Sequence, residues 1–443
     1  MKQIAIYGAI DRFNYGDLLF PIILERMFEK HTPEYQIKFY GVIESDLSAY
    51  GAKPTKSVES LFDKDNLTDG SIVIVAGGEV LTAQWYKIFS FLIPENLRSY
   101  TDAIQQTIPN SILRKIKPSL PGVDLAQPFV IAPGDFGANV KVVYNAVGGL
   151  GFEKTEEAES IREKLSNATF VSVRDRSTFD SLFSLNQSKP VELAPDSASL
   201  MSVFFPKELL LSKIHPHFEH WINQNKDGYI TLQIAKKYAL DRSIINSLVD
   251  KIEQIYHQTH LPTVLCPIGT AAYHEDQIPL QAIQEKINTP SLLVENPSVF
   301  DIMALIANSA LFIGTSLHGA VTAMSFEVPN LAITTNYKKV ESYLNTWALP
   351  DLRNTVDIDN LSQEIDRALS ISKMLLEQKR QELVNKSFES FSKMYKALEE
   401  PINDSLNHEA TRPFLPEVEK KDKEEGIFFK RWLLKIFKFI IKK

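Results

Sequence analysis

Short runs of apolar residues alternate with amphipathic stretches along the first half of the chain. Between the runs, apolar positions spaced three and four residues apart predict helices such as Asp17–Glu29 and Thr155–Ser166. Continuous apolar strands separated by helices are typical of a parallel sheet that is covered on both faces. The predicted strands are Gln3–Ile10, Gln36–Val42, Ser71–Ala76, Phe129–Ala132, Lys141–Ala146, Phe170–Val173 and Val191–Ala194.

A second series of the same kind follows a looser, proline-containing stretch over Phe205–Asp227. After this series, Asn360–Leu398 contains no proline and predicts one or two long helices. The predicted strands of the second series are Gly228–Ile234, Thr263–Pro267, Ser291–Val294, Ala310–Ile313 and Asn330–Thr334. Its predicted helices are Arg242–His257, Val299–Asn308 and Leu317–Phe326.

The pattern therefore predicts an α/β fold with two Rossmann-like domains facing a cleft. We expect an N-terminal domain over residues 1–204, a C-terminal domain over 228–345 and C-terminal helices over 346–400. A length of 443 residues agrees with this division, because a single hydrophobic core rarely grows so large. In such folds ligands bind outside the carboxyl ends of the strands.

Composition narrows the class of protein. Cys266 is the single cysteine, which excludes a disulfide framework and a multi-cysteine zinc site and suits a reducing cytoplasm. The apolar run near the N-terminus is short and is followed directly by Asp11, so it indicates a strand and not a signal peptide. No apolar stretch is long enough to predict a membrane-spanning helix.

Charge is distributed unevenly along the chain. The net charge is −7, yet residues 427–443 contain no acidic residue. The rest of the chain is therefore more acidic than the total, which argues against nucleic acid as a partner. The cations of the last segment are Lys430, Arg431, Lys435, Lys438, Lys442 and Lys443.

These cations alternate with large apolar residues such as Trp432 and Phe437. At helical spacing Arg431, Lys435, Lys438 and Lys442 line one narrow face, so residues 427–443 predict a basic amphipathic helix that lies on a membrane surface. Residues 401–426 hold three prolines and mixed charges, and predict a flexible tether. The alternative is a helix that docks onto the body of the protein or onto a second copy.

Two glycine-containing loops follow predicted strands of the first domain. In the first loop Gly16 permits close approach of the backbone to a ligand, and Asp17 is either an acid/base group or a helix cap. In the second loop Gly77 and Gly78 form either a plain tight turn or a phosphate-binding turn.

Arg174 follows another strand, where its guanidinium can bind a carboxylate or phosphate through two parallel hydrogen bonds. The alternative is an ion pair of Arg174 with Asp175 or with a glutamate across the loop.

The strand-to-helix loop around His318 is the most informative. Thr315 or Ser316 caps the next helix, and His318 falls in its first turn, where the free N–H groups and the helix dipole favour an anion. The alternative is a packed histidine that closes the turn. Lys339 follows the next strand and can reach the same anion, as can the adjacent Lys338.

Taken together and in order, these segments resemble the polysaccharide pyruvyl transferase family over roughly residues 1–345. The segments that carry the resemblance are Asn14-Tyr15-Gly16-Asp17, Gly77-Gly78, Val171-Ser172-Val173-Arg174-Asp175, Pro195-Asp196, Ser316-Leu317-His318 and Lys339-Val340. The sequence departs from the family's pattern at Glu79, where a further glycine is common.

The resemblance implies a fold like that of the two-domain glycosyltransferases of the B type. It implies phosphoenolpyruvate as donor substrate, no cofactor and no metal, and transfer of the enolpyruvyl group onto two hydroxyls of a sugar as a ketal. By position, Arg174, His318 and Lys339 would bind the donor, with Ser316, Gly16, Gly77 and Gly78 lining the site, and Asp17 would be the acid/base.

We expect the sugar to belong to a precursor of a cell-surface polysaccharide such as a capsule or exopolysaccharide, carried by a lipid or a nucleotide. We further expect a protein that works in the cytoplasm on the inner face of the cell membrane. The competing interpretations are a glycosyltransferase that uses a nucleotide-sugar and a non-catalytic saccharide-binding relative. Fold alone does not separate them.

Overall fold

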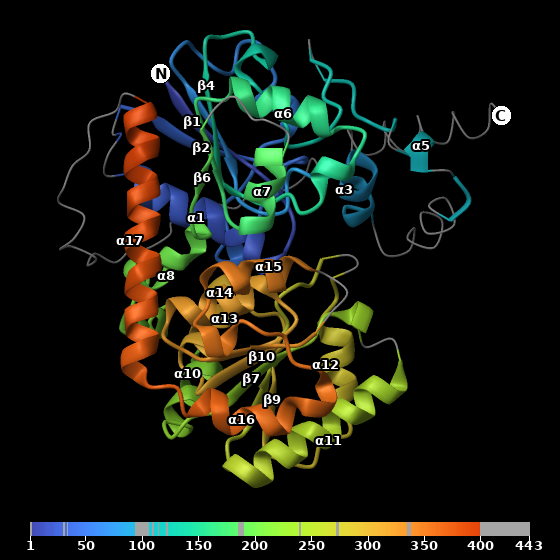
Figure 1. The fold of residues 1–443 in the computed structure, drawn as a ribbon, viewed down its shortest axis with the longest axis vertical. Helices are drawn as coiled ribbons and strands as arrows, with labels where there is room; N and C mark the ends of the chain where they lie inside the picture. Colours follow the sequence, from blue (N-terminus) through green and yellow to red (C-terminus); the bar gives the residue numbers. More distant parts are fainter. Residues whose placement is uncertain are drawn as a thin grey trace.

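The computed structural model consists of two parallel sheets, each flanked by helices (Figure 1). The structure describes residues 2–29, 32, 34–93, 106–108, 110–113, 115–120, 123–184, 190–238, 241–271, 274–334 and 338–398. Residues 401–443, with the expected tether and basic helix, lie outside the described residues. None of the described helices has the length and apolar character needed to cross a bilayer.

The first sheet has the order β2-β1-β3-β4-β5-β6, and every strand pair in it is parallel. Its strands β1 and β3 are buried along their whole length, as their continuous apolar sequences predict. The strands are β1 Gln3–Tyr7, β2 Gln36–Tyr40, β3 Ile72–Ala76, β4 Lys141–Val147, β5 Phe170–Val173 and β6 Glu192–Leu193.

The second sheet has the order β11-β10-β7-β8-β9 and is also parallel throughout. The sequence prediction of two Rossmann-like units is therefore confirmed, with strand ends that differ by a few residues. The strands are β7 Ile230–Gln233, β8 Thr263–Leu265, β9 Ser291–Leu293, β10 Leu311–Gly314 and β11 Asn330–Ala332.

Helices connect the strands and cover the sheets. Those between the strands of the first sheet are α1 Tyr15–Glu29, α2 Val58–Leu61, α3 Trp85–Phe91, α5 Asn110–Leu113, α6 Ala158–Asn167 and α7 Arg176–Ser184. Between the sheets lie the 3-10 turn η5 Ser197–Leu200 and helices α8 Met201–Phe204, α9 Lys207–Leu211 and α10 Pro216–Gln224. The second domain and the C-terminal part contain α11 Arg242–Thr259, α12 Gln277–Gln284, α13 Val299–Ala307, α14 Leu317–Ser325, α15 Lys338–Trp347, α16 Leu361–Leu369 and α17 Lys373–Ala397.

Helix α17 returns from the second domain to the first. It runs along one side of the molecule past both sheets, as the long orange helix in Figure 1 shows. Near its end the Tyr395 ring packs edge-on against Phe28 of α1, and the Tyr395 hydroxyl donates to the carbonyl of Met27 at 2.8 Å. The two halves of the molecule are thus joined by both the α8–α10 segment and α17.

The predicted strand Phe129–Ala132 is wrong. The segment is buried, but it forms a turn and irregular backbone instead of joining the sheet. The Tyr144 side chain supplies hydrogen bonds to it: the Ile131 amide donates to the Tyr144 hydroxyl at 2.7 Å, and that hydroxyl donates to the Ile131 carbonyl at 2.6 Å. A buried backbone needs partners, and here one hydroxyl provides them for Ile131 in place of a strand.

Candidate functional site

The order of the strands marks one point in each domain where chain connections diverge. In the first sheet this switch lies between β1 and β3, and in the second between β7 and β10. Ligands of open α/β sheets bind at such switch points, outside the carboxyl ends of the strands. The loops after β1 and β3 carry the predicted Gly16, Asp17, Gly77 and Gly78, which therefore lie at the switch point of the first sheet. The predicted His318 follows β10 and lies at the switch point of the second sheet.

These two switch points meet directly. Asn14 pairs with Gly269 of the other domain, and the Tyr15 amide donates to the carbonyl of Ile268 at 3.1 Å. Gly16, in the first turn of α1, faces His318 of α14 so closely that an added Cβ would overlap Nδ1 of the imidazole. Gly16 thus permits the approach of one domain's helix to the other domain's histidine.

Asp17 and the glycine pair lie on the first domain's side of this contact. The Asn14 side-chain amide donates to Oδ2 of Asp17 at 2.7 Å. Gly77 and Gly78 have φ of +48° and +74°, and a Cβ on Gly78 would stand 3.3 Å from Oδ1 of Asp17. Because α1 begins at Tyr15, Asp17 lies inside the first helical turn and does not precede the helix.

Arg174 is enclosed by carboxylates. Its side chain is 2% exposed and bonds Oε2 of Glu79 at 3.0 Å and Oδ2 of Asp196 at 3.2 Å. Burial acts to lower the pKa of Arg174, but Glu79, Asp196 and Asp175 outweigh it and the pKa lies above its usual range. The ion pair with a glutamate, left open by the sequence, is therefore present, and its partner is the residue that departs from the family's pattern.

The second carboxylate, Asp196, connects Arg174 to His318. Its Oδ2 lies 3.4 Å from Nε2 of His318, and its Oδ1 accepts from the Ala198 amide at 3.0 Å. Burial alone would raise the pKa of Asp196, but His318 and Arg174 outweigh it and the pKa lies below its usual range. Asp196 thus stays ionised between the Arg174 guanidinium and the His318 imidazole.

Helix α14 fixes the position of the histidine. The Ser316 hydroxyl accepts from the Gly319 amide at 3.2 Å and caps the helix, as predicted. His318 is the second residue of α14, and its ring packs edge-on against Phe20 with 5.5 Å between centroids. The side chain is 12% exposed. His318 is therefore both packed, as the alternative interpretation held, and directed to the shared face of the two domains.

Of the two adjacent lysines, Lys339 faces the site. Lys338 is exposed and bonds Glu341 of the same helix at 3.2 Å. Lys339 is half-buried; burial and Arg174 lower its pKa, whereas Glu79 and Asp17 act to raise it. Lys339 is therefore within electrostatic range of Arg174, Glu79 and Asp17.

The structure adds three residues to which the sequence gave no role: Glu79, Asp196 and His274. Glu79 and Asp196 were noted only as a departure and as part of a motif. His274 follows β8, and burial, Lys339 and Arg12 lower its pKa to about 4, while Asp17 acts to raise it. Its position beyond the carboxyl end of a strand was the available signal. Within the described ranges no group of three His, Cys, Asp or Glu side chains is arranged for a metal ion.

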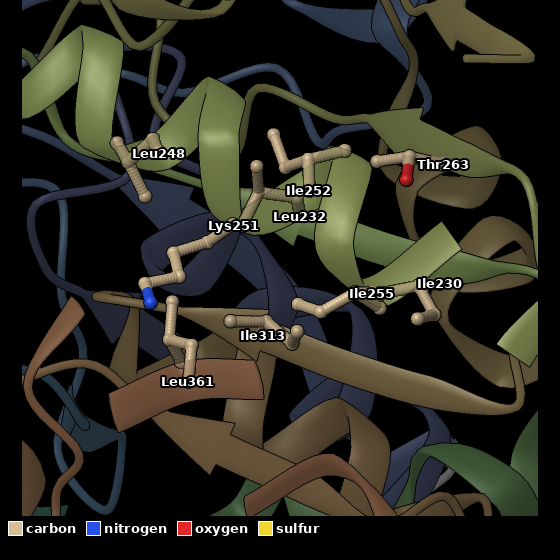
Figure 2. A pocket seen from close by; sticks show the side chains of 9 residues that line it. All are labelled: Ile230, Leu232, Leu248, Lys251, Ile252, Ile255, Thr263, Ile313 and Leu361. Atoms are coloured by element: carbon tan, nitrogen blue, oxygen red, sulfur yellow. The ribbon is translucent and has the colours of Figure 1, made fainter. Parts of the chain in front are cut away.

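An apolar cavity lies elsewhere, beneath α11 of the second domain. It is lined by Leu232 and Ile313 of the sheet, Ile252 of α11 and Leu361 of α16, among others (Figure 2). Lys251 and Thr263 are the polar residues among its lining. It is a gap in helix-to-sheet packing, and none of the predicted site residues lines it.

A sequence model of the family described as polysaccharide pyruvyl transferase matches residues 14–337. The chain belongs to the polysaccharide pyruvyl transferase family. The match covers both switch points and reaches from Asn14 to just before Lys338. A search of curated protein sequences finds no match to this polysaccharide pyruvyl transferase family member.

Solved structures support the fold of this pyruvyl transferase family member. A UDP-GlcNAc 2-epimerase from Neisseria meningitidis, bound to UDP-GlcNAc, superimposes with a TM-score of 0.53 at 14% identity, covering 89% of this chain and 100% of that one. The UDP-GlcNAc 2-epimerase from Methanocaldococcus jannaschii gives 0.52 at 11% identity, covering 84% and 94%. At such identities the likeness shows the two-domain fold alone, which resembles the B-type glycosyltransferases as expected.

Proposed function

We propose that this chain transfers the enolpyruvyl group of phosphoenolpyruvate onto two hydroxyls of a sugar in a polysaccharide precursor, forming a pyruvate ketal. One observation carries the proposal: the loop with Gly16 and Asp17 and the helix with His318 meet across the two domains. An acid/base group and an anion-binding helix end are thereby brought to one place, within a family of pyruvyl transferases.

Phosphoenolpyruvate carries about three negative charges, so its site must supply cations and amide donors. Lys339, a cation, and His318, a hydrogen-bond donor, are the half-buried side chains that we assign to the donor substrate. Arg174 is held by Glu79 and Asp196, so a direct donor contact would require an ion pair to open. We therefore assign Arg174 chiefly to the support of these two carboxylates.

The chemistry requires a proton at the donor's methylene carbon. Protonation there makes the neighbouring carbon electrophilic, and a sugar hydroxyl attacks it as a base accepts the hydroxyl proton. Phosphate then leaves with the C–O bonding pair, and the second hydroxyl attacks the same carbon and gives its proton to the base or to the departing phosphate; this closure is intramolecular and therefore fast. We assign proton transfer to Asp17, whose carboxylate is held by Asn14 at the helix start.

We also propose that residues 427–443 hold the enzyme on the inner face of the cell membrane. Six cations and no acid in this segment favour an anionic lipid surface. Such a location suits a lipid-linked saccharide as acceptor.

The test is phosphate release from phosphoenolpyruvate with a panel of lipid-linked and nucleotide-linked sugars. Acceptor-dependent release is expected, with loss in His318→Ala and retention in His257→Ala, an exposed histidine on α11. No release with any acceptor, together with no donor binding by calorimetry, would overturn the proposal. Turnover of a nucleotide-sugar instead would identify a glycosyltransferase.

A further inference from the structure

Four side chains of alternating charge form a continuous series through the interior. Glu79 follows β3, Arg174 follows β5 and Asp196 follows β6, all in the first domain, whereas His318 belongs to α14 of the second. Successive contacts measure 3.0, 3.2 and 3.4 Å. The series therefore connects the carboxyl ends of one sheet to the histidine of the other domain.

The histidine depends on Asp196 within this series. Nε2 of His318 is buried and makes no hydrogen bond of regular geometry within the described part of the chain, and Oδ2 of Asp196 stands 3.4 Å away. Nδ1 is directed at Gly16, which offers no side chain. A small approach of the domains would turn the Nε2 contact into a charged hydrogen bond, and Asp196 is the acceptor in position for it.

Asp196 is itself held rigidly. Its side chain is fully buried, with Arg174 on Oδ2 and the Ala198 amide on Oδ1. Its own amide donates to the Tyr343 hydroxyl at 3.3 Å. An acceptor fixed at so many points determines the orientation of the imidazole next to it.

We propose that Asp196 is the positioning residue for His318, and that it holds the imidazole in the orientation that receives the donor. The inference rests on the proposed function. Asp196 acts through His318 and does not contact the substrate. A carboxylate that is fixed beside an imidazole orients the ring, so a histidine that Asp196 supports presents its N–H group to phosphoenolpyruvate in one direction.

The charged groups around His318 set the expected pH dependence. They are Asp196 at Nε2, Arg174 on the same Oδ2 oxygen of Asp196, and Asp17 next to Gly16 on α1. Removal of the Asp196 charge leaves the Arg174 cation less compensated beside His318. We therefore expect the pH profile of kcat/KM to differ between Asp196→Asn and the wild-type enzyme.

The experiment is a double-mutant cycle on the full chain with Asp196→Asn, His318→Gln and the double variant. If Asp196 acts through His318, its substitution lowers kcat/KM about 10- to 100-fold in the wild-type background and has little further effect beside His318→Gln. Effects that multiply independently would overturn the inference. Asp301→Asn is the matched control, since Asp301 is also buried and bonds backbone at Ser298 and His215.

A second cycle, measured by urea unfolding, does not depend on activity. The same variants should show coupling between Asp196 and His318 and none between Asp301 and His318; absence of coupling in the first pair would also overturn the inference. If Asp196 and His318 are coupled in unfolding but even the wild-type enzyme releases no phosphate, the proposed function fails, whereas the Asp196–His318 contact is supported.

A third variant covers a failure of Asp196→Asn to fold. Asp196→Glu keeps the charge but moves the carboxylate by one methylene group. We expect reduced kcat and a shifted pH profile from it, and wild-type values for both would refute the positioning role.

Discussion

Gly16 of α1 and His318 of α14 face each other across the two domains with no room for a side chain between them. The contact joins a residue near the start of the chain to one 302 positions later, and it brings together the two loops that carry the proposed chemistry. Each domain supplies a part of the site that the other lacks.

Gly16→Ala is expected to displace the imidazole or separate the domains. A misplacement of about 1 Å in an active site costs about 100-fold in rate, and overpacking costs about 1–3 kcal/mol in stability. Steady-state turnover and urea unfolding measure the two effects. Gly134→Ala is the matched control, because no atom lies within 4 Å of a Cβ added there. Equal activity of the two variants would contradict the close contact.

Asp17→Asn is expected to lower kcat by about 10²- to 10⁴-fold with little change in donor affinity, because an amide cannot exchange protons at neutral pH. The variant keeps an oxygen to accept from the Asn14 side chain, so the loop should retain its structure. Single-turnover phosphate release, paired with calorimetric binding of phosphoenolpyruvate, separates the two quantities. An unchanged kcat would assign the proton transfer to another group.

Lys339→Gln is expected to weaken binding of phosphoenolpyruvate by about 10- to 100-fold, the effect of losing a hydrogen bond to a charged group. Lys338→Gln is the neighbouring control, and it should bind the donor normally because Lys338 is exposed and paired with Glu341. Calorimetry with the donor alone measures both. The reverse ranking would show that Lys338 is the donor ligand.

Asp276 makes stability depend on pH. Burial raises its pKa to about 7, although Gln233 and the amides of Gly269 and Ile268 donate to it. Because the folded pKa exceeds the unfolded value, the contribution to stability is fully present below pH 4 and is lost as pH rises to about 7. Asp276→Asn should remove this dependence.

As the pH rises from about 4 to 7, the free energy of unfolding of the wild type should therefore fall relative to that of Asp276→Asn. About 1.4 kcal/mol per pKa unit gives an upper limit of about 4 kcal/mol. Urea unfolding at pH 4 to 8 measures it. A constant difference across the range would show that Asp276 ionises normally in the folded protein.

Removal of residues 427–443 should abolish sedimentation of the protein with vesicles that contain anionic lipids and leave activity on a water-soluble acceptor unchanged. The physical reason is the loss of six cations together with the apolar residues between them. Vesicles of neutral lipid are the control and should bind the full chain weakly. Equal sedimentation before and after truncation would contradict the membrane proposal.

The inner strands of both sheets, such as β1, β3 and β10, could be predicted from sequence because each is a short apolar run bounded by loops. Phe129–Ala132 shows the limit of that reading. Its pattern is that of a buried strand, but the hydroxyl of Tyr144 satisfies its backbone, and such a long-range contact has no local signature.

The sequence predicted which loops form the site, but not the ion pairs that its side chains make with one another. Gly16, Asp17 and His318 occupy strand-to-helix loops, and the fold brings these loops together. The partners of Arg174 were not predictable, because Glu79 and Asp196 lie far from it in sequence and meet it only when β3, β5 and β6 align. Likewise, which of two adjacent lysines faces inward depends on the phase of α15, whose start the strand pattern does not determine.

The return of α17 to the first domain has a consequence for biosynthesis. A ribosome makes Phe28 about 370 residues before the tyrosine that covers it, since Tyr395 belongs to the last described helix. During most of translation the first domain therefore exposes an apolar edge of α1, although its sheet is already complete. The nascent chain reaches this packing only after α17 has been synthesised, so the first domain completes its surface late in translation.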